Sequence, residues 1–282
     1  MTQAAAQSSA STTADVIVVG AGPAGSSAAY HMATLGLDVI LLEKQELGRD
    51  KVCGDGLTPS AVRELVSMGV DTSGWQRNRG LRVIGGGHLL HFPWPEQASF
   101  PSYGMARPRA LLDRDLAEHA AAAGARLLTG VTVTAPVTSP TGRVTGVEAR
   151  PTNRVAYPGI EGPTTFTAPL VVDAGGVSAR LATAVGRTKN ERRPMGVAVR
   201  AYFRSPRAKD AWMESRLELW DGKPGKSDLL PGYGWIWSVG EGLVNVGLGS
   251  VSSRASATAI DYRAVFNRWM DNVPASWGFT KE

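Results

Sequence analysis

Runs of apolar residues near the start of the chain predict a parallel sheet. Val16 to Val19 and Val39 to Leu42 are short, partly β-branched runs of the kind that forms strands buried on both faces. Between them, Pro23 to Leu35 is a small-residue amphipathic segment that predicts a helix, and Gly36 is suited to end it. This strand–helix–strand order is typical of a doubly wound α/β fold.

The middle of the chain predicts further helices and short strands. One helix is expected from Pro59 to about Met68, with Thr58 as its cap, and a longer one from Arg107 to Ala123. Leu170 to Asp173 predicts another buried strand, and Ser178 is placed to cap a short helix after it. The other expected elements are a hairpin over 80–92 and strands over 126–134 and 144–149.

The last third of the chain predicts a separate, antiparallel sheet. Short strand-like segments follow one another through glycine-bearing turns, and a helix over Ile260–Met270 closes the series. The expected strands are Val197–Phe203, Arg216–Trp220, Tyr233–Val239 and Leu243–Val251. Tyr233, Trp235 and Trp237 alternate along one of them and therefore share a sheet face. They are either ordinary core or the wall of a site for a long apolar ligand.

The turn after the first strand, Gly20-Ala21-Gly22-Pro23-Ala24-Gly25, has the G-x-G-x-x-G spacing of a dinucleotide site. Gly20 permits the tight turn, Gly22 lets backbone approach a pyrophosphate, and Gly25 lets the helix pack closely on the strand. The helix start offers N–H groups and a positive dipole end to phosphate. Glu43 lies 18 residues beyond Gly25, where a carboxylate can accept both ribose hydroxyls. The spacing leaves the identity of the dinucleotide open.

Composition narrows the function classes. The chain of 282 residues is 43% hydrophobic and 20% charged, as is usual for soluble globular proteins. Its one cysteine, Cys53, excludes an internal disulfide and fits a reducing cytoplasm. The four scattered histidines predict no metal site, and no G-x-S-x-G elbow indicates a hydrolase. The small, polar first 14 residues are expected to form a disordered tail and not a secretion signal.

The net charge of +5 is modest, with basic clusters at Lys189–Arg193 and Arg204–Lys209. A solvated face is the favoured interpretation, and contact with anionic lipid head groups at a membrane surface is the alternative. Nucleic-acid binding is disfavoured because no recognised motif accompanies the charge. Two single residues are also open to two interpretations. Cys53 is either a buried small hydrophobe or part of a loop that approaches a cofactor, and Arg107 is either in a surface ion pair or in contact with the cofactor.

Taken together, these segments resemble the geranylgeranyl reductase family of FAD-dependent oxidoreductases, in particular bacterial members that saturate the isoprenoid tail of menaquinone. The residues that carry the resemblance are VVGAGPAGSSAA, RDKVCGDGLTPSAV, the FPSYGMARPRALLD region, GVAVRAYF, and LPGYGWIW followed by LVNVGLGS. They are distributed over nearly the whole chain after the tail. KVCGDGLTP and PGYGWI are far more specific than the glycine fingerprint.

The resemblance implies a Rossmann-type FAD-binding domain like that of para-hydroxybenzoate hydroxylase, with an inserted antiparallel substrate sheet. By this resemblance the FAD domain covers 15–73 and 105–190, and the substrate domain covers 74–104 and 191–282. The implied cofactor residues, some of which the motif also indicates, are Gly20, Gly22, Ala24, Gly25, Glu43, Cys53, Gly54, Gly56, Arg107, Val133, Asp173 and Gly175. Among these, Val133 would offer its backbone to the adenine, and Asp173 and Gly175 form an acid-bearing glycine turn at a second strand end.

The implied reaction is reduction of an isolated double bond in a prenyl lipid, with either a reduced nicotinamide or a ferredoxin-type protein as electron donor. Tyr233 and Trp235 match the family's aromatic motif beside the flavin and the prenyl chain. An unactivated alkene needs a strong hydride donor, a proton source and exclusion of water. Cys53 and Tyr233 are the hypothetical proton donors, because both are expected near the flavin.

The chain departs from the family pattern in three places. The family's Ala-Asp-Gly turn is replaced by Asp173-Ala174-Gly175-Gly176, and its Phe-Pro by Trp237-Ser238. The family's later Gly-Asp motif is not found before Glu282, so we expect a chain that lacks the last part of the FAD domain and retains FAD weakly. Two alternatives stay open: an FAD monooxygenase or halogenase of the same fold, and a catalytically incompetent fragment that binds prenyl lipid.

Overall fold

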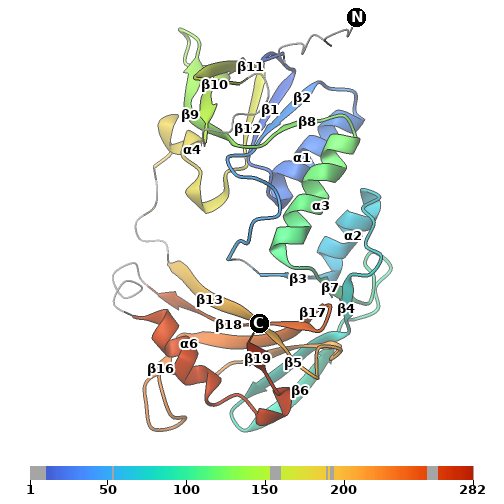
Figure 1. Ribbon diagram of the computed structural model, residues 1–282, viewed down its shortest axis with the longest axis vertical. Coiled ribbons are helices and arrows are strands. Elements are labelled where there is room, and N and C mark those ends of the chain that lie inside the picture. Colours follow the sequence, from blue (N-terminus) through green and yellow to red (C-terminus); the bar gives the residue numbers. More distant parts are fainter. Residues whose placement is uncertain are drawn as a thin grey trace, which may run out of the picture. The chain divides into compact units, whose positions relative to one another are not determined.

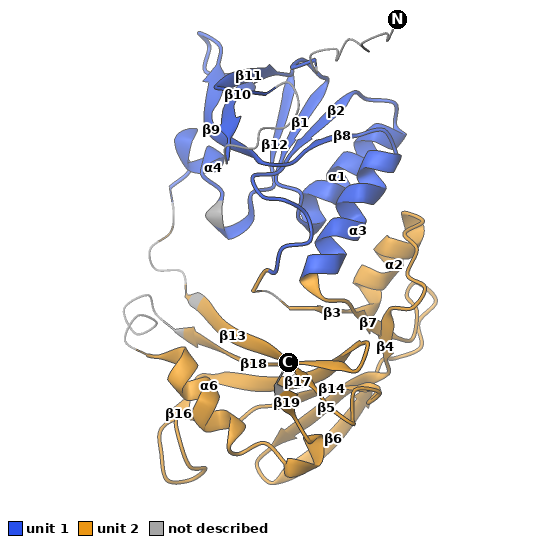
Figure 2. Cartoon of the chain, in the orientation of Figure 1, with its two compact units in different colours: residues 1–50, 110–189 blue, residues 51–109, 190–282 orange. Residues whose placement is uncertain are grey.

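The structure is a computed structural model that describes residues 11–52, 54–152, 160–188, 190, 194–252 and 260–281. It divides into two compact units (Figure 2): unit 1 comprises residues 1–50 and 110–189, and unit 2 comprises 51–109 and 190–282. The predicted division differs in placing 51–73, 105–109 and residue 190 with the first unit. Residues 51–73 group with unit 2 because helix α2 (Pro59–Ser67) packs against strands β3 (Gly56–Leu57) and β7 (Gly104–Ala106).

A parallel sheet forms the centre of unit 1. Its four strands run in the order β12-β1-β2-β8, and every neighbouring pair is parallel. The strands are β12 (Leu170–Asp173), β1 (Val16–Val19), β2 (Val39–Leu42) and β8 (Arg126–Leu128). The bounds predicted for β1 and β2 are confirmed to the residue, because both runs are apolar on both faces and end at polar or glycine positions.

Two helices cover one face of this sheet, α1 (Pro23–Thr34) and α3 (Arg109–Ala122), which lie side by side in Figure 1. Ala29 of α1 and Ala117 and Ala120 of α3 are fully buried in one cluster with alternate residues of β1 and β2. Helix α3 begins two residues later than predicted. The backbone N–H of Arg107 donates to the carbonyl of Asp55 at 3.0 Å, so Arg107 belongs to the preceding loop.

A second, antiparallel sheet covers the other face of the parallel one. It has three strands in the order β11 (Thr164–Thr167), β10 (Val144–Pro151) and β9 (Val131–Thr138). Val147 and Phe166 are buried against Ile17 and Ile40. The prediction of one strand over 126–134 is wrong. The chain bends at Gly130, which has a φ of +68°, so the first part becomes β8 of the parallel sheet and the second becomes β9.

Unit 2 is built on a seven-stranded sheet in the order β19-β13-β18-β17-β14-β5-β6. The strands are β19 (Thr280–Lys281), β13 (Met195–Arg204), β18 (Leu243–Ser252), β17 (Gly232–Gly240), β14 (Trp212–Arg216), β5 (Gly80–Gly85) and β6 (His88–Pro93). The pairs are antiparallel, as predicted, except that β14 and β5 run parallel. The predicted strand Arg216–Trp220 is wrong, because β14 ends at Arg216 and the separate strand β15 (Leu219–Trp220) pairs with β16 (Leu229–Leu230).

The two faces of this sheet differ in chemistry. Ile236, Val246 and Leu248 are buried on the face that helix α6 (Tyr262–Met270) covers. Trp235 and Trp237 are on the opposite face, where they cluster with Ala106 of β7. Strand β7 lies between β3 and β4 (Gln76–Asn78) in a small three-stranded sheet.

Short elements complete the described chain. The helix α4 (Leu181–Ala184) follows a 3-10 turn over Gly176–Ser178, and a second 3-10 turn covers Ala275–Trp277. Within the described ranges, no helix combines the length and the apolar character needed to cross a bilayer.

Candidate active site

The glycine loop of unit 1, Gly20 to Gly25, has the close approaches that its sequence predicts. Gly20 has a φ of +101°, and a Cβ there would lie 2.7 Å from the carbonyl oxygen of Ala174. At Gly25 a Cβ would lie 1.8 Å from the carbonyl oxygen of Gly20. Any side chain at Gly25 would therefore separate helix α1 from the turn.

The start of helix α1 fits a diphosphate group. Gly22 is the N-cap and Pro23 occupies the first turn, where a missing N–H costs nothing. The N–H groups of Ala24 and Gly25 lie in the first turn, where a helix supplies no carbonyl partner. A narrow glycine cradle at a helix N-terminus is the arrangement that binds phosphate.

Glu43 is already bonded to the protein at the end of β2. One carboxylate oxygen accepts the N–H of Ala21 at 2.9 Å, and the other accepts the N–H of Gln45 at 3.0 Å. The acid therefore holds the glycine loop in place. Each carboxylate oxygen has a second lone pair, so these bonds leave acceptor capacity for the predicted ribose contact.

The second glycine turn lies beside the first, but its acid has a local role. Gly175 approaches the Cβ position of Gly20 within 3.3 Å. The carboxylate of Asp173 accepts the N–H of Gly175 at 3.1 Å and that of Ala182, in the first turn of α4, at 2.9 Å. Ser178 lies in the 3-10 turn before α4, so the predicted Ser178 cap is wrong and Asp173 binds the helix start in its place.

Val133 lies on β9 opposite Ala149, with its side chain packed against the core cluster. Two residues earlier, the N–H of Val131 donates to the carbonyl of Glu43 at 2.9 Å. Val133, the predicted adenine contact, therefore lies on β9 two residues beyond the backbone bond to Glu43, the predicted ribose contact. Both roles stay predictions.

The CGDG loop of unit 2 centres on a residue that the sequence did not single out. Cys53 lies outside the described residues. A Cβ at Gly54 would meet open space, whereas at Gly56 it would lie 2.3 Å from the methyl of Met213. Between these glycines, Asp55 is fully buried. An acid in a glycine-rich loop was the only available signal for it.

We call Asp55, Arg109, Tyr202 and Asn245 the Asp55 cluster. One carboxylate oxygen of Asp55 accepts the backbone N–H of Arg109 at 3.0 Å. The other accepts the Tyr202 hydroxyl at 2.8 Å and the Asn245 amide at 2.5 Å. Burial raises the pKa of Asp55 above its usual value, and the hydrogen bonds from Asn245 and Tyr202 and the charge of Arg200 oppose that rise.

Tyr233, Trp235 and Trp237 form what we call the aromatic wall, and the prediction that they share a face is confirmed. The rings of Tyr233 and Trp235 are 5.7 Å apart, and those of Trp235 and Trp237 are stacked at 5.6 Å. Both tryptophans are 8% exposed and Tyr233 is 43% exposed. The wall therefore runs from the interior to an accessible phenol.

The position of Trp235 is defined from two sides. Its indole N–H donates to the Asn245 amide oxygen at 2.8 Å. A Cβ at Gly247, directly across on β18, would lie 2.4 Å from the indole. The glycines of the VNVGLGS segment leave the space in which the flat ring lies.

Arg107 contacts an aromatic ring of its own unit. Its guanidinium lies over Trp75, 5.2 Å from the ring centroid. The sequence did not predict this stacking on Trp75. The predicted contact of Arg107 with the cofactor stays a prediction.

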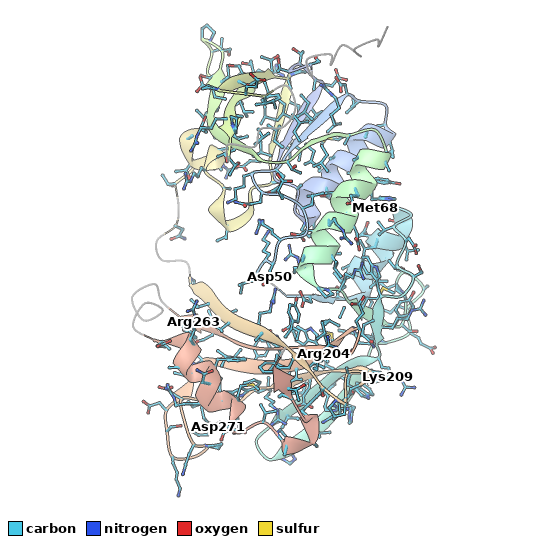
Figure 3. The ribbon with its side chains drawn as sticks, viewed as in Figure 1. Asp50, Met68, Arg204, Lys209, Arg263 and Asp271 are labelled. Atoms are coloured by element: carbon cyan, nitrogen blue, oxygen red, sulfur yellow. The ribbon has the colours of Figure 1, made fainter. Side chains whose placement is uncertain are left out.

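A second charged cluster joins β5 to the β13–β14 connection, which Arg204 and Lys209 mark in Figure 3. Arg82 donates to both carboxylate oxygens of Asp210, at 2.7 and 3.1 Å, and to Glu214 at 3.3 Å. Burial alone would raise the pKa of Asp210, but the hydrogen bonds from Arg82 and Arg207 outweigh it and lower that pKa.

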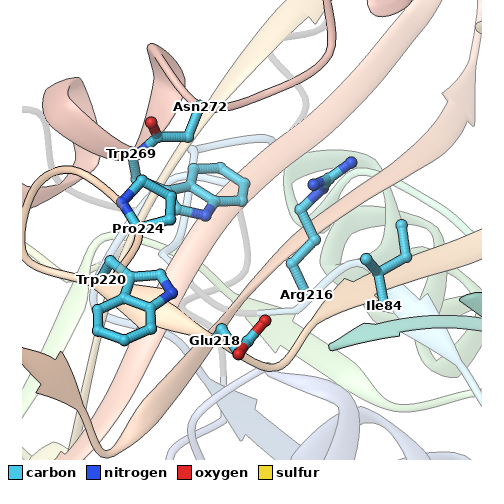
Figure 4. A pocket seen from close by; sticks show the side chains of 7 residues that line it. All are labelled: Ile84, Arg216, Glu218, Trp220, Pro224, Trp269 and Asn272. Atoms are coloured by element: carbon cyan, nitrogen blue, oxygen red, sulfur yellow. The ribbon is translucent and has the colours of Figure 1, made fainter. Parts of the chain in front are cut away.

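The described residues of unit 2 line hollows of different size. A cavity of about 120 Å³ (Figure 4) is lined by Ile84, Arg216, Glu218, Trp220, Pro224, Trp269 and Asn272. Its charged side chains already bond to the protein, Arg216 to Glu214 at 2.9 Å and Glu218 to the N–H of Gly86 at 3.1 Å. A larger hollow of about 560 Å³ is lined by residues of β13 and α6 together with Asp271.

Comparison with known proteins identifies the family to which the chain belongs. The chain belongs to the family of FAD binding domains, whose model matches residues 13–257. The family identifies FAD as the cofactor, an assignment that the spacing of the glycine loop alone left open. That the glycine loop binds FAD stays a prediction.

The relatives narrow the family further. The chain is 38% identical over 275 residues to the menaquinone reductase of Mycolicibacterium smegmatis, covering 96% of this chain and 63% of that protein. It is 30% identical to digeranylgeranylglycerophospholipid reductase 1 of Methanosphaera stadtmanae, covering 88% and 57%. These similarities confirm the resemblance to the geranylgeranyl reductase family. The chain spans about three fifths of the length of these relatives.

A solved structure confirms the predicted fold. The geranylgeranyl bacteriochlorophyll reductase-like protein of Thermoplasma acidophilum aligns with a TM-score of 0.76 at 23% identity, covering 96% of this chain and 64% of that one. The Rossmann-type FAD-binding architecture with an additional antiparallel sheet is thus shared.

Proposed function

We propose that the chain belongs to an FAD-dependent reductase that saturates isolated double bonds in the prenyl chain of a lipid such as menaquinone. The observation that carries this proposal is the 38% identity to a menaquinone reductase over 96% of the chain. The aromatic wall supports it, because stacked indoles next to an exposed phenol suit a long apolar ligand with one reacting end.

The residues of unit 1 would hold the adenosine diphosphate part of FAD. The diphosphate would accept N–H groups at the start of α1, in the space that Gly20, Gly22 and Gly25 leave free. Glu43 would accept the ribose hydroxyls while its bond to Ala21 keeps the loop in shape. When bound, FAD would supply the hydride, with its electrons coming from a nicotinamide or a ferredoxin-type donor.

The residues of unit 2 would position the alkene and deliver the proton. Trp235 and Trp237 would orient the chain and exclude water from it. Tyr233, which is 43% exposed, is one candidate donor, and Cys53 is the second. If Tyr233→Phe and Cys53→Ala both keep the full single-turnover rate, neither residue donates the proton.

The direct test uses the purified chain with added FAD, dithionite and menaquinone. Mass spectrometry should show a product with two additional hydrogens in the prenyl tail, and Gly25→Ala, which closes the glycine cradle, should show none. A flavin-loaded protein that leaves every prenyl lipid unchanged would contradict the proposal. Oxygen consumption with an aromatic substrate would favour the monooxygenase or halogenase alternative, and prenyl-lipid binding without flavin would favour the incompetent fragment.

We also propose a peripheral contact with anionic membranes, supported by the net charge of +5 and the Arg204–Lys209 cluster. Within that cluster Arg207 is already engaged, since it bonds to Asp210 and lies over Trp277. Cosedimentation with vesicles containing anionic lipid, compared with neutral vesicles, tests the contact. Equal binding to both would contradict it. A cytoplasmic location stays a prediction from the single cysteine.

A further inference from the structure

Three side chains form a hydrogen-bonded chain that runs from the CGDG loop to the aromatic wall. Asp55 accepts the amide N–H of Asn245 at 2.5 Å. The oxygen of the same amide accepts the indole N–H of Trp235 at 2.8 Å. Both Asp55 and Asn245 are fully buried, so water cannot replace either partner.

The chemistry of Asp55 decides which way the Asn245 amide points. The Asp55 oxygen that faces Asn245 accepts its amide N–H and the Tyr202 hydroxyl, so the amide turns its NH₂ group toward Asp55. Its oxygen is then left facing Trp235, the one direction in which it can accept the indole N–H. The remaining bonds of Asp55, to Arg109 and Tyr202, hold the carboxylate itself in place.

The sheet register makes this coupling direct. Asn245 lies opposite Tyr202 on β13 and opposite Trp237 on β17. Trp235 lies opposite Gly247 and stacks on Trp237. A rotation of one amide would therefore act on the ring at the centre of the wall, which has no free space toward Gly247.

We propose that Asp55 is a positioning residue that, by orienting the Asn245 amide, fixes the indole of Trp235 and thereby the aromatic wall against which the prenyl chain lies. The part that concerns the prenyl chain rests on the proposed function, whereas the coupling of Asp55 to the indole does not. Asp55 itself contacts neither substrate nor cofactor in this proposal.

The isosteric variant Asp55→Asn tests the coupling. The backbone N–H of Arg109 can only donate, so the new amide keeps its oxygen there and turns its NH₂ group toward Tyr202 and Asn245. If the Asn245 amide turns over to accept from it, the NH₂ group of Asn245 faces the indole N–H and the ring must move. We therefore expect the exciton couplet of the stacked Trp235–Trp237 pair in circular dichroism to be lost, with Trp237→Phe identifying that band.

The double variant Asp55→Asn/Asn245→Asp is the rescue. It keeps one buried carboxylate but moves it to position 245, where it accepts both the new amide at 55 and the Trp235 indole. The couplet should return. Tyr202→Phe is the matched control, because it removes one bond to Asp55 without reversing the amide, and it should lower the melting temperature but keep the couplet.

Activity gives a second, separable readout. Misplacing a reacting group by about 1 Å can cost on the order of 100-fold in rate, so kcat for prenyl reduction should fall at least about tenfold in Asp55→Asn and recover in the double variant. KM should change less. If neither the parent nor any variant reduces prenyl lipid, the proposed function is contradicted. The circular dichroism couplet still tests whether Asp55 is coupled to the Trp235 indole.

Three results would overturn the coupling. They are an unchanged couplet in Asp55→Asn, a loss of the couplet in Tyr202→Phe as large as in Asp55→Asn, and a double variant that folds without the couplet. If Asp55→Asn does not fold, the double variant alone tests the proposal. A native couplet in the double variant supports it. Loss of the couplet, or a double variant that does not fold, contradicts it.

Discussion

The glycine loop of unit 1 and the Asp55 cluster of unit 2 each depend on one acid, but they are built in different ways. Glu43 accepts two backbone N–H groups, one from 22 residues away and one from its own strand end. Asp55 accepts two side chains that are 147 and 190 residues away in sequence, together with one backbone N–H. The glycine loop is therefore shaped mainly by backbone contacts. The Asp55 cluster is formed by side chains that come together only when the whole sheet has formed.

The largest effect should come from breaking the backbone-built site. Gly25→Ala places a Cβ 1.8 Å from the Gly20 carbonyl oxygen, and neither backbone segment can yield cheaply. We expect a loss of at least the ~1–3 kcal/mol that overpacking usually costs, and no flavin absorbance after desalting with FAD. Gly162→Ala, where a Cβ meets open space in the same unit, is the control in urea unfolding. A Gly25→Ala protein as stable as this control would contradict the close approach.

Removing the two acids compares the sites directly. Asp55→Ala leaves a hydroxyl, an amide and a backbone N–H without their buried acceptor, which should lower the free energy of unfolding by about 3 kcal/mol. Glu43→Ala should cost about 1 kcal/mol, because Glu43 is only half-buried and water can reach its partners. Urea denaturation measures both variants. Equal losses would show that the distinction between the two sites has no energetic basis.

The pH dependence of stability should separate Asp55 from Asp210. The pKa of Asp55 is raised in the folded state, so its ionisation should reduce stability as the pH rises from about 3.9, the unfolded value, to the raised folded value. The pKa of Asp210 is lowered, so its contribution is present above about 3.9 and is lost as the pH falls toward the folded value. The melting temperature of each variant, Asp55→Asn and Asp210→Asn, is subtracted from that of the parent and followed with pH. The difference for Asp55→Asn should fall as the pH rises above about 3.9, whereas the difference for Asp210→Asn should rise as the pH approaches about 3.9 from below. A slope of the same sign for both would contradict the assignment.

The smallest effect concerns Asp173, whose carboxylate accepts backbone N–H groups at the second glycine turn and at the start of α4. Its carboxylate bonds to Ala182 at the start of α4, so Asp173→Ala should cost about 1 kcal/mol, as loss of a helix cap does. Asp173→Asn retains an acceptor and should cost less. Flavin retention after desalting distinguishes this local role from the predicted cofactor contact, since only the latter would make FAD binding weaker in Asp173→Asn.

The sequence was informative where a local pattern determines the structure. The strands Val16–Val19 and Val39–Leu42, the glycine turn between them and the shared face of Tyr233, Trp235 and Trp237 all follow from periodicity within about a dozen residues. The division of 126–134 into two strands depends on one left-handed glycine, Gly130, which a run of strand-forming residues conceals.

The site of unit 2 could not be predicted in the same way. Nothing near Asp55 indicates that its acceptors would be filled by Tyr202 and Asn245, because these partners are set by the pairing of β13 with β18. The error at Arg216–Trp220 has a similar cause, since β14 takes its bounds from the distant strand β5, its parallel neighbour. Contacts of this kind arise only when the whole sheet is assembled.

The order in which the two units use the chain has a consequence for how the protein is made. Unit 1 takes residues 1–50 and 110–189, and unit 2 takes 51–109 and 190–282, so each unit is interrupted by the other. During synthesis, β1 must wait for β12 to complete its sheet, and the β5–β6 hairpin must wait for β14. Such long delays between pairing strands are typical of slow folding and expose unpaired edges to aggregation. No single cut in the chain would release either unit whole.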